Sequence, residues 1–250
     1  MSKLIFTLLL LLPFLMNTKK ISRKHLAVGD WAWKCKCLNE NEIGECLKLH
    51  CDVDQDQTVS CFSIYSTVEL PSGTRKHLKD LIFNEEIITL DESLQRRTDR
   101  FIGFLHLDEN VQGAFLNITT LNYENETNFI LITPKHLIFK DSENAVLAEK
   151  LSFSDSIIDS SGKQSNILSI RKVSFQGVAA PLTESGTALI DGYWTSNYAS
   201  YENHQKAHLA FWGYRTGAKL LGERVSGRNE KGILRYASFL MQIKSWMGSE

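Results

Sequence analysis

Cys61-Phe62-Ser63-Ile64-Tyr65-Ser66-Thr67-Val68 is the stretch that decides the fold, because it places a thiol at the head of a β-strand pattern. A second stretch, Ile132-Thr133-Pro134-Lys135-His136, ends 75 residues after Cys61 and follows the apolar strand pattern 128–131. It places a hydroxyl and an imidazole three residues apart. A thiol together with a positioned imidazole is the minimum equipment for nucleophilic acyl chemistry.

Further strand patterns surround these two stretches and are separated by turn signals such as Pro71-Ser72-Gly73. Short strands at roughly regular spacing predict an all-β domain, and no internal repeat is visible in it. The expected strands are 67–70, 87–90, 101–105, 114–116, 129–139, 167–170 and 188–190. After about residue 200 the apolar side chains take helical spacing, with Ile233, Tyr236, Ala237 and Leu240 on one face. We therefore expect a short helical C-terminal tail.

Length and charge limit the classes of function. The chain has 250 residues, of which 43% are hydrophobic and 23% charged, which suits one good-sized domain plus smaller parts. A net charge of -1 gives no basic surface, so we expect no nucleic-acid partner.

The N-terminus has the pattern of a signal peptide. Residues 4–16 are apolar, and as a helix they span about 20 Å, which is short of the roughly 30 Å of a bilayer core. A signal peptide over residues 1–18 is therefore favoured over a membrane anchor. It predicts a secreted, extracellular protein that is processed in the secretory pathway.

Export explains the cysteines. Segment 19–60 is too short to build a core unaided, and it holds four cysteines: Cys35, Cys37, Cys46 and Cys51. In an oxidising compartment an even cluster predicts two disulfides, with three pairings open. Zinc is the alternative, although paired Cys-x2-Cys knuckles are missing. Cys61 is the odd thiol. Two glycosylation sequons, at Asn117 and Asn125, fit a surface loop of a secreted protein.

Several motifs in order resemble the autoprocessing Hint domain of hedgehog proteins, the Hog domain. The Cys61-Phe62 start and the Thr133-x-x-His136 motif resemble the family's, and further matches extend the similarity to roughly residues 61–247. These matches are Gly177–Thr187, Ser196–Ala199, His204, Ala207-His208, Gly232-Ile233 and Tyr236. The resemblance implies a Hint fold with pseudo-twofold symmetry over residues 61–200. It also implies an acceptor (sterol) recognition region over 201–250.

The resemblance also implies a reaction. Cys61 attacks the Ser60–Cys61 peptide bond, and the thioester is resolved by a sterol-like alcohol or by water, with no cofactor and no metal. His136 would protonate the leaving amide nitrogen, while Thr133 would hydrogen-bond the distorted amide or steady the imidazole. The substrate is the protein's own N-terminal segment. Once released, that segment would be a signal for a cell-surface receptor.

Two positions depart from the family pattern. His106 stands where the family has an Asp that activates the sterol hydroxyl, and Asn197 stands where it has a cysteine. His106 is either a base for the acceptor step or a surface residue, with Asp108 as the next candidate base. His204 and His208 have the i, i+4 spacing of a metal pair but show no third ligand, so we assign them to structure.

Two other functions compete with self-cleavage. One is a secreted cystine-rich ligand or matrix protein whose Hint-like domain is inactive. Intact Cys61, Thr133 and His136 argue against it. The other is a papain-like thiol protease, which would carry its cysteine on a helix.

Overall fold

The computed structural model describes residues 61–199, 203–222, 227–228 and 232–240, together with the backbone of 33–40 and 46–53. It confirms a mostly β domain with a short helical tail. Ser60 and the expected signal peptide, 1–18, lie outside the described residues. None of the described helices is long and apolar enough to cross a bilayer.

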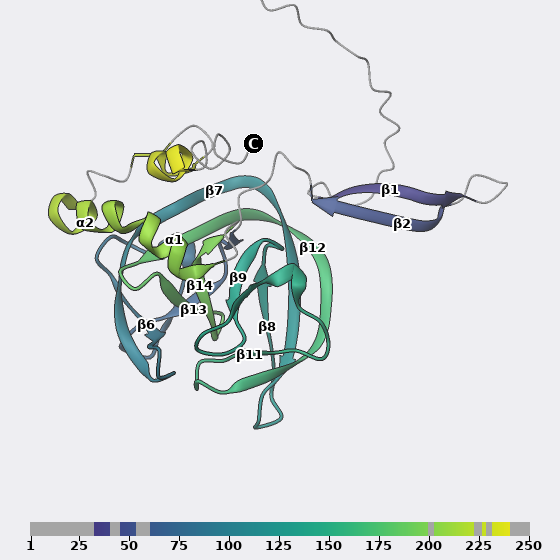
Figure 1. The fold of residues 1–250 in the computed structure, drawn as a ribbon, viewed down its shortest axis with the longest axis horizontal. Coiled ribbons are helices and arrows are strands. Elements are labelled where there is room, and N and C mark those ends of the chain that lie inside the picture. Colours follow the sequence, from purple (N-terminus) through teal and green to yellow (C-terminus); the bar gives the residue numbers. More distant parts are fainter. Residues whose placement is uncertain are drawn as a thin grey trace, which may run out of the picture.

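Two long antiparallel strands form the spine of the domain. β7 (Arg96–Leu121) and β12 (Gln164–Thr183) lie side by side and curve around the whole body (Figure 1). Their pairing runs from Leu121↔Asn166 to Phe101↔Thr183 and is interrupted by four register shifts. The expected strands 101–105 and 114–116 are therefore parts of one strand. The polar stretch between them has no strand pattern, and pairing with β12 extends it.

The domain contains a repeat that its sequence does not reveal. In the first half, a hairpin, a 3-10 turn and a short strand lead into β7: β4 (Thr67–Glu69), β5 (Arg75–His77), η2 (Leu78–Asp80) and β6 (Glu86–Leu90). The same order leads into β12 in the second half: β9 (His136–Phe139), β10 (Ala145–Leu147), η3 (Ala148–Lys150) and β11 (Ser156–Ile158). Leu81 and Leu151 end the two 3-10 turns alike, and both are buried. This order agrees with pseudo-twofold symmetry.

Two predicted strands are broken at the residues that carry the chemistry. The pattern 61–68 contains β3 (Phe62–Ser63), a turn closed by the Ser66 N–H on the Ser63 carbonyl, and then β4. The pattern 129–139 splits into β8 (Thr127–Ile132) and β9 around Pro134. Proline supplies no N–H to a ladder, so the strand ends there and turns.

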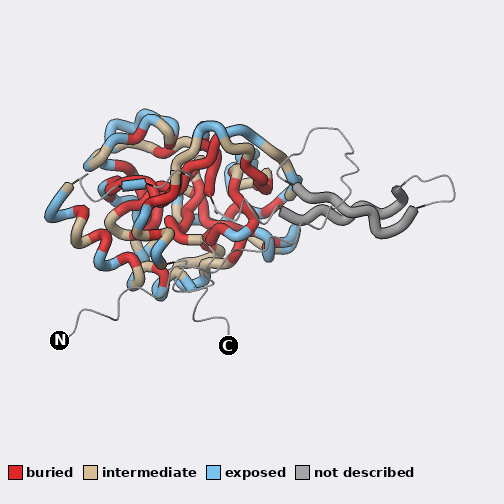
Figure 2. Tube along the Cα trace, turned by 90° about the horizontal axis from the view of Figure 1, so that it is seen from above, coloured by how far each residue is buried: buried red, intermediate tan, exposed pale blue. Residues whose placement is uncertain are grey.

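Two sheets position the site. The larger has the order β11-β12-β3-β8-β7-β6, so the two residues of β3 lie between β12 and β8. The smaller has the order β10-β9-β14-β13, with β13 (Thr187–Ile190) and β14 (Tyr193–Ala199). Buried residues concentrate along the strands inside the body (Figure 2).

The helices cover the side of the core that contains Cys61. α1 (His204–Ala210), α2 (Trp212–Leu221) and the helical residues 235–240 pack on this part. One apolar cluster joins Cys61 to β7, β12 and all three helical segments. The helical tail is thus confirmed through residue 240, and it is packed against the thiol's own cluster.

The cysteine cluster lies on a hairpin of β1 (Trp33–Glu40) and β2 (Cys46–Val53). Its backbone register pairs Cys35 with Cys51. The side chains of the four cysteines lie outside the described residues, so two disulfides and the zinc alternative both stay predictions.

The two sequons differ in setting. Asn117 lies in the middle of β7, paired with Leu131 on β8 and Arg171 on β12, and not in a loop as expected. Asn125 is exposed in the turn between β7 and β8, with φ of 62°.

Candidate active site

Cys61 lies just before β3 and is fully buried. Its amide N–H donates to the Thr133 hydroxyl at 2.7 Å, and the Thr133 N–H donates to the Cys61 carbonyl at 3.0 Å. The nitrogen in the first contact belongs to the peptide bond that follows Ser60. Of the two roles expected for Thr133, the structure therefore places its hydroxyl on the amide.

His106 lies against the thiol. Its Nδ1 is 3.1 Å from the Cys61 Sγ, and its side chain is 5% exposed. The sequence left open whether this residue is a base or a surface residue, and the structure shows that it is buried. The contact arises because β7 runs antiparallel to β12, where His106 pairs with Ala180 beside the start of β3. The neighbouring Asp108 instead accepts from the amides of Asn110 and Val111.

Burial controls the charge of the thiol. It raises the pKa of Cys61 well above its usual value, because a thiolate loses hydration in the core. Since the thiolate is the nucleophile, a buried thiol needs a base in contact with it. His106 is a base at hydrogen-bonding distance from that thiol.

His136 is the first residue of β9 and is fully buried. Its Nε2 lies 2.7 Å from the Ser196 carbonyl, which accepts and so assigns the proton to Nε2. The ring lies against Phe62, with centroids 4.2 Å apart, and its backbone N–H closes the Pro134 turn on the Thr133 carbonyl. The imidazole is therefore fixed in orientation, with its Nε2 proton directed at the Ser196 carbonyl.

Helix α1 is tied to the strand that holds His136. Ser196 Oγ lies 2.9 Å from His204 Nδ1, and Tyr198 OH lies 2.9 Å from His208 Nδ1. Burial, together with the positive charge of Arg215, lowers the pKa of both histidines to about 4. Neutral imidazoles thus dock the helix at neutral pH, a role that the i, i+4 spacing alone did not reveal.

Neither these histidines nor other described residues offer a metal site, since no group of three His, Cys, Asp or Glu side chains gathers there. Asn197, at the position of the family's cysteine, also has a packing role. Its Oδ1 accepts from both the amide and the hydroxyl of Thr183, each at 2.9 Å. In this chain an amide thus ties β14 to β12.

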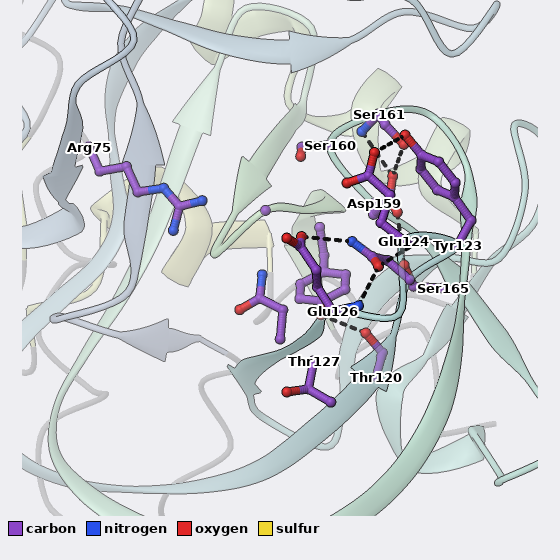
Figure 3. A pocket seen from close by; sticks show the side chains of 14 residues that line it. Arg75, Thr120, Tyr123, Glu124, Glu126, Thr127, Asp159, Ser160, Ser161 and Ser165 are labelled. Atoms are coloured by element: carbon purple, nitrogen blue, oxygen red, sulfur yellow. Dashed lines mark hydrogen bonds between the residues drawn. The ribbon is translucent and has the colours of Figure 1, made fainter.

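A cavity of about 520 Å³ lies elsewhere, near the turn that carries Asn125. Its wall is polar: Asp159 accepts from Ser161 and Ser165, and Arg75 lies across from them (Figure 3). None of Cys61, His106, Thr133 and His136 lines it. The proposed chemistry is therefore separate from this cavity.

Comparison with known proteins agrees with the fold and the motifs. The family model of the Hint module matches residues 52–249. Tiggy-winkle hedgehog protein of Danio rerio is 29% identical over 221 residues, covering 80% of this chain and 52% of that protein. Protein hedgehog of Drosophila hydei is 28% identical over 204 residues, covering 76% and 41%. The chain thus spans about half the length of these relatives.

Among solved structures, a DnaB intein from Synechocystis sp. PCC 6803 is similar at 18% identity and a TM-score of 0.47, covering 57% of this chain and all of that one. The family match covers most of the chain and includes all four residues of the candidate site. The chain therefore belongs to the Hint family and is related to the hedgehog proteins.

Proposed function

We propose that the chain cleaves its own backbone between Ser60 and Cys61 and passes the N-terminal segment to an acceptor. Membership in the Hint family supports self-processing in general. The observation that carries the specific proposal is the double contact of Cys61: its amide nitrogen bonds to Thr133 and its thiol to His106. One residue thus presents both its leaving group and its nucleophile to polar partners inside an apolar core.

In the first step, His106 Nδ1 takes the thiol proton and Sγ attacks the carbonyl carbon of residue 60. The C–N bond breaks, and the nitrogen takes a proton from Nδ1 of His136, which enters the step as an imidazolium and keeps its other proton on Nε2 toward the Ser196 carbonyl. The Thr133 hydroxyl accepts the amide N–H and so holds the leaving nitrogen in place. The products are a thioester on Cys61 and its free α-amine, and the net result is one proton moved from His136 to His106.

Before the second step, His106 gives its extra proton to solvent and His136 takes one from solvent. His106 then accepts a proton from the acceptor hydroxyl as the acceptor oxygen attacks the thioester carbonyl. The C–S bond breaks, and the Cys61 thiolate takes that proton back from His106. A sterol-like alcohol gives an ester and water gives a free acid. The change from the family's Asp to His106 leaves a base at this position, so transfer does not need a carboxylate there.

Secretion and signalling by the released segment are also part of the proposal. A signal peptide would send the chain into the secretory pathway, and the released cystine-bearing segment would act outside the cell on a receptor. The alternative, a secreted ligand or matrix protein with an inactive Hint domain, predicts an intact chain. The buried contact between Cys61 and His106 favours activity, because a thiol kept only for packing needs no base.

The test is Cys61→Ala in the full chain, made in cell-free translation with a labelled amino acid and chased at neutral pH. We expect the wild type to yield two fragments divided between Ser60 and Cys61, and the variant to stay intact. Equal cleavage of both, or an intact wild type that folds, would contradict the proposal.

A further inference from the structure

A short segment from the C-terminal tail pairs with β7 directly beside His106. The Leu107 N–H donates to the Gly232 carbonyl at 3.1 Å, and the Leu234 N–H donates to the Leu105 carbonyl at 2.8 Å. His106 and Ile233 are therefore bridge partners. On its other edge, His106 pairs with Ala180 of β12. The segment Gly232–Leu234, which we call the 232–234 segment, completes the sheet around the base.

The other pairings along the same edge of β7 show why residues 105–107 need the 232–234 segment. On the side away from β12, β6 pairs with residues 96–100 and β8 with residues 116–121. In the described part of the chain, the 232–234 segment is what pairs with β7 at 105–107 on this edge. A strand held on one edge and interrupted by register shifts is poorly fixed, and pairing on both edges restrains it.

Gly232 makes the close approach possible. Its φ is 71°, and a Cβ at this position would lie 2.1 Å from the Leu107 carbonyl oxygen and 2.9 Å from its carbon. These are backbone atoms that cannot rotate away, so a side chain here must push the segment and β7 apart. Gly227, five residues earlier, is a matched control, because a Cβ there would meet only the Arg235 side chain, at 3.7 Å.

Packing holds the 232–234 segment in place. Leu234 is fully buried and Ile233 nearly so, both in the apolar cluster that contains Cys61. Just beyond them, the Tyr236 hydroxyl donates to the Ala210 carbonyl at 2.9 Å. The position of the segment thus depends on helix packing, and the position of β7 at His106 depends on the segment.

We infer that Gly232 is a positioning residue for self-processing: the 232–234 segment holds His106 against the Cys61 thiol. The inference rests on the proposed function, and it assigns the C-terminal tail a part in forming the thioester. A displacement on the order of 1 Å in a reacting pair can cost about 10²-fold in rate.

The test is a double-mutant cycle on the labelled full chain, with excess hydroxylamine to trap the thioester. We expect Gly232→Ala to slow fragment release by about 10–100-fold, and Gly227→Ala to stay within about twofold of wild type. In a His106→Ala background, Gly232→Ala should have almost no further effect on the rate. The effects of two independent substitutions would add, whereas Gly232 can act through His106 only when His106 is present. Limited proteolysis of each variant serves as the control that its domain is folded.

Leu234→Pro gives a second route if Gly232→Ala does not fold. It removes the N–H donated to Leu105 and puts a ring carbon in its place against the Leu105 carbonyl, so it also separates the segment from β7, while proline is tolerated at the start of the helix that follows. Equal slowing by Gly232→Ala in both backgrounds, or wild-type rates in both segment variants, would overturn the inference while leaving the proposed function intact. Failure of the wild type to release fragment would instead contradict the proposed function.

Discussion

Thr133→Val tests the contact on the scissile nitrogen with little change in shape. Valine keeps the side-chain volume but removes the oxygen that accepts the Cys61 N–H at 2.7 Å. A neutral hydrogen bond contributes about 1 kcal/mol net, and one to a charged group about 1.5–3 kcal/mol. Because the nitrogen becomes cationic as it leaves, the bond strengthens during the reaction by about 0.5–2 kcal/mol. At 1.36 kcal/mol per tenfold in rate, cleavage should slow by about 2–30-fold.

Thr133→Ser is the matched control, because it keeps the hydroxyl and loses a methyl group. The assay is the rate of fragment release from labelled full chain in excess hydroxylamine, with the unfolding midpoint in urea measured on Cys61→Ala versions of each variant. The valine variant should also lose about 1–3 kcal/mol of stability, since a buried N–H is left unpaired. If the Thr133→Val and Thr133→Ser variants both release fragment as fast as the wild type, the hydroxyl does not hold the leaving nitrogen.

The remaining predictions concern other parts of the chain. His106→Ala should slow hydroxylamine-induced cleavage by about 10²–10⁴-fold, because the base contacts the thiol itself; an unchanged rate would restrict His106 to the acceptor step. The free energy of unfolding should fall as the pH drops from 6.5 toward 4, because His204 and His208 bind protons in the unfolded chain at a pH where they stay neutral in the folded one. Melting temperatures of His208→Gln should depend less steeply on pH than those of the wild type, and an equally steep dependence would contradict this. In secretory cells, Asn125→Gln should remove a glycan detected by endoglycosidase shift, while Asn117→Gln should change nothing, since Asn117 lies within a paired strand; the opposite pattern would show that glycans are added before β7 forms.

The sequence was sufficient to predict what depends on local order. Strand patterns and turn residues predicted an all-β domain, and the spacing of Thr133 and His136 placed both near one turn. Family resemblance supplied the fold and the pairing of Thr133 with Cys61. Each of these features depends on residues near in sequence or on a motif with a known order.

Long-range register is what the sequence could not supply. The contact between His106 and Cys61 joins residues 45 positions apart and depends on how β7 pairs with β12 across register shifts. We propose from this contact a role in the first step for a residue that the sequence assigned to the second step or to the surface. The carbonyl of Ser196, which fixes His136, is a backbone group and has no signature in side-chain patterns.

The internal repeat was expected from the family resemblance, but the residue pattern itself did not reveal it, for a related reason. The two halves share the order of hairpin, 3-10 turn and strand, but they meet different neighbours and so bury different side chains. Leu81 and Leu151 correspond, whereas Leu78 corresponds to Ala148. Backbone geometry is kept while residue identity drifts, so the symmetry appears in the structure and not in the sequence.

The most direct test of the account is the mass of the N-terminal fragment that hydroxylamine releases from the full chain. We predict a fragment ending at Ser60 with a C-terminal hydroxamate, formed in the wild type and lost in Cys61→Ala, because a thioester exchanges readily with this nucleophile. A fragment with a free carboxylate at every hydroxylamine concentration, or one ending at another residue, would contradict the claim that Cys61 forms a thioester with residue 60.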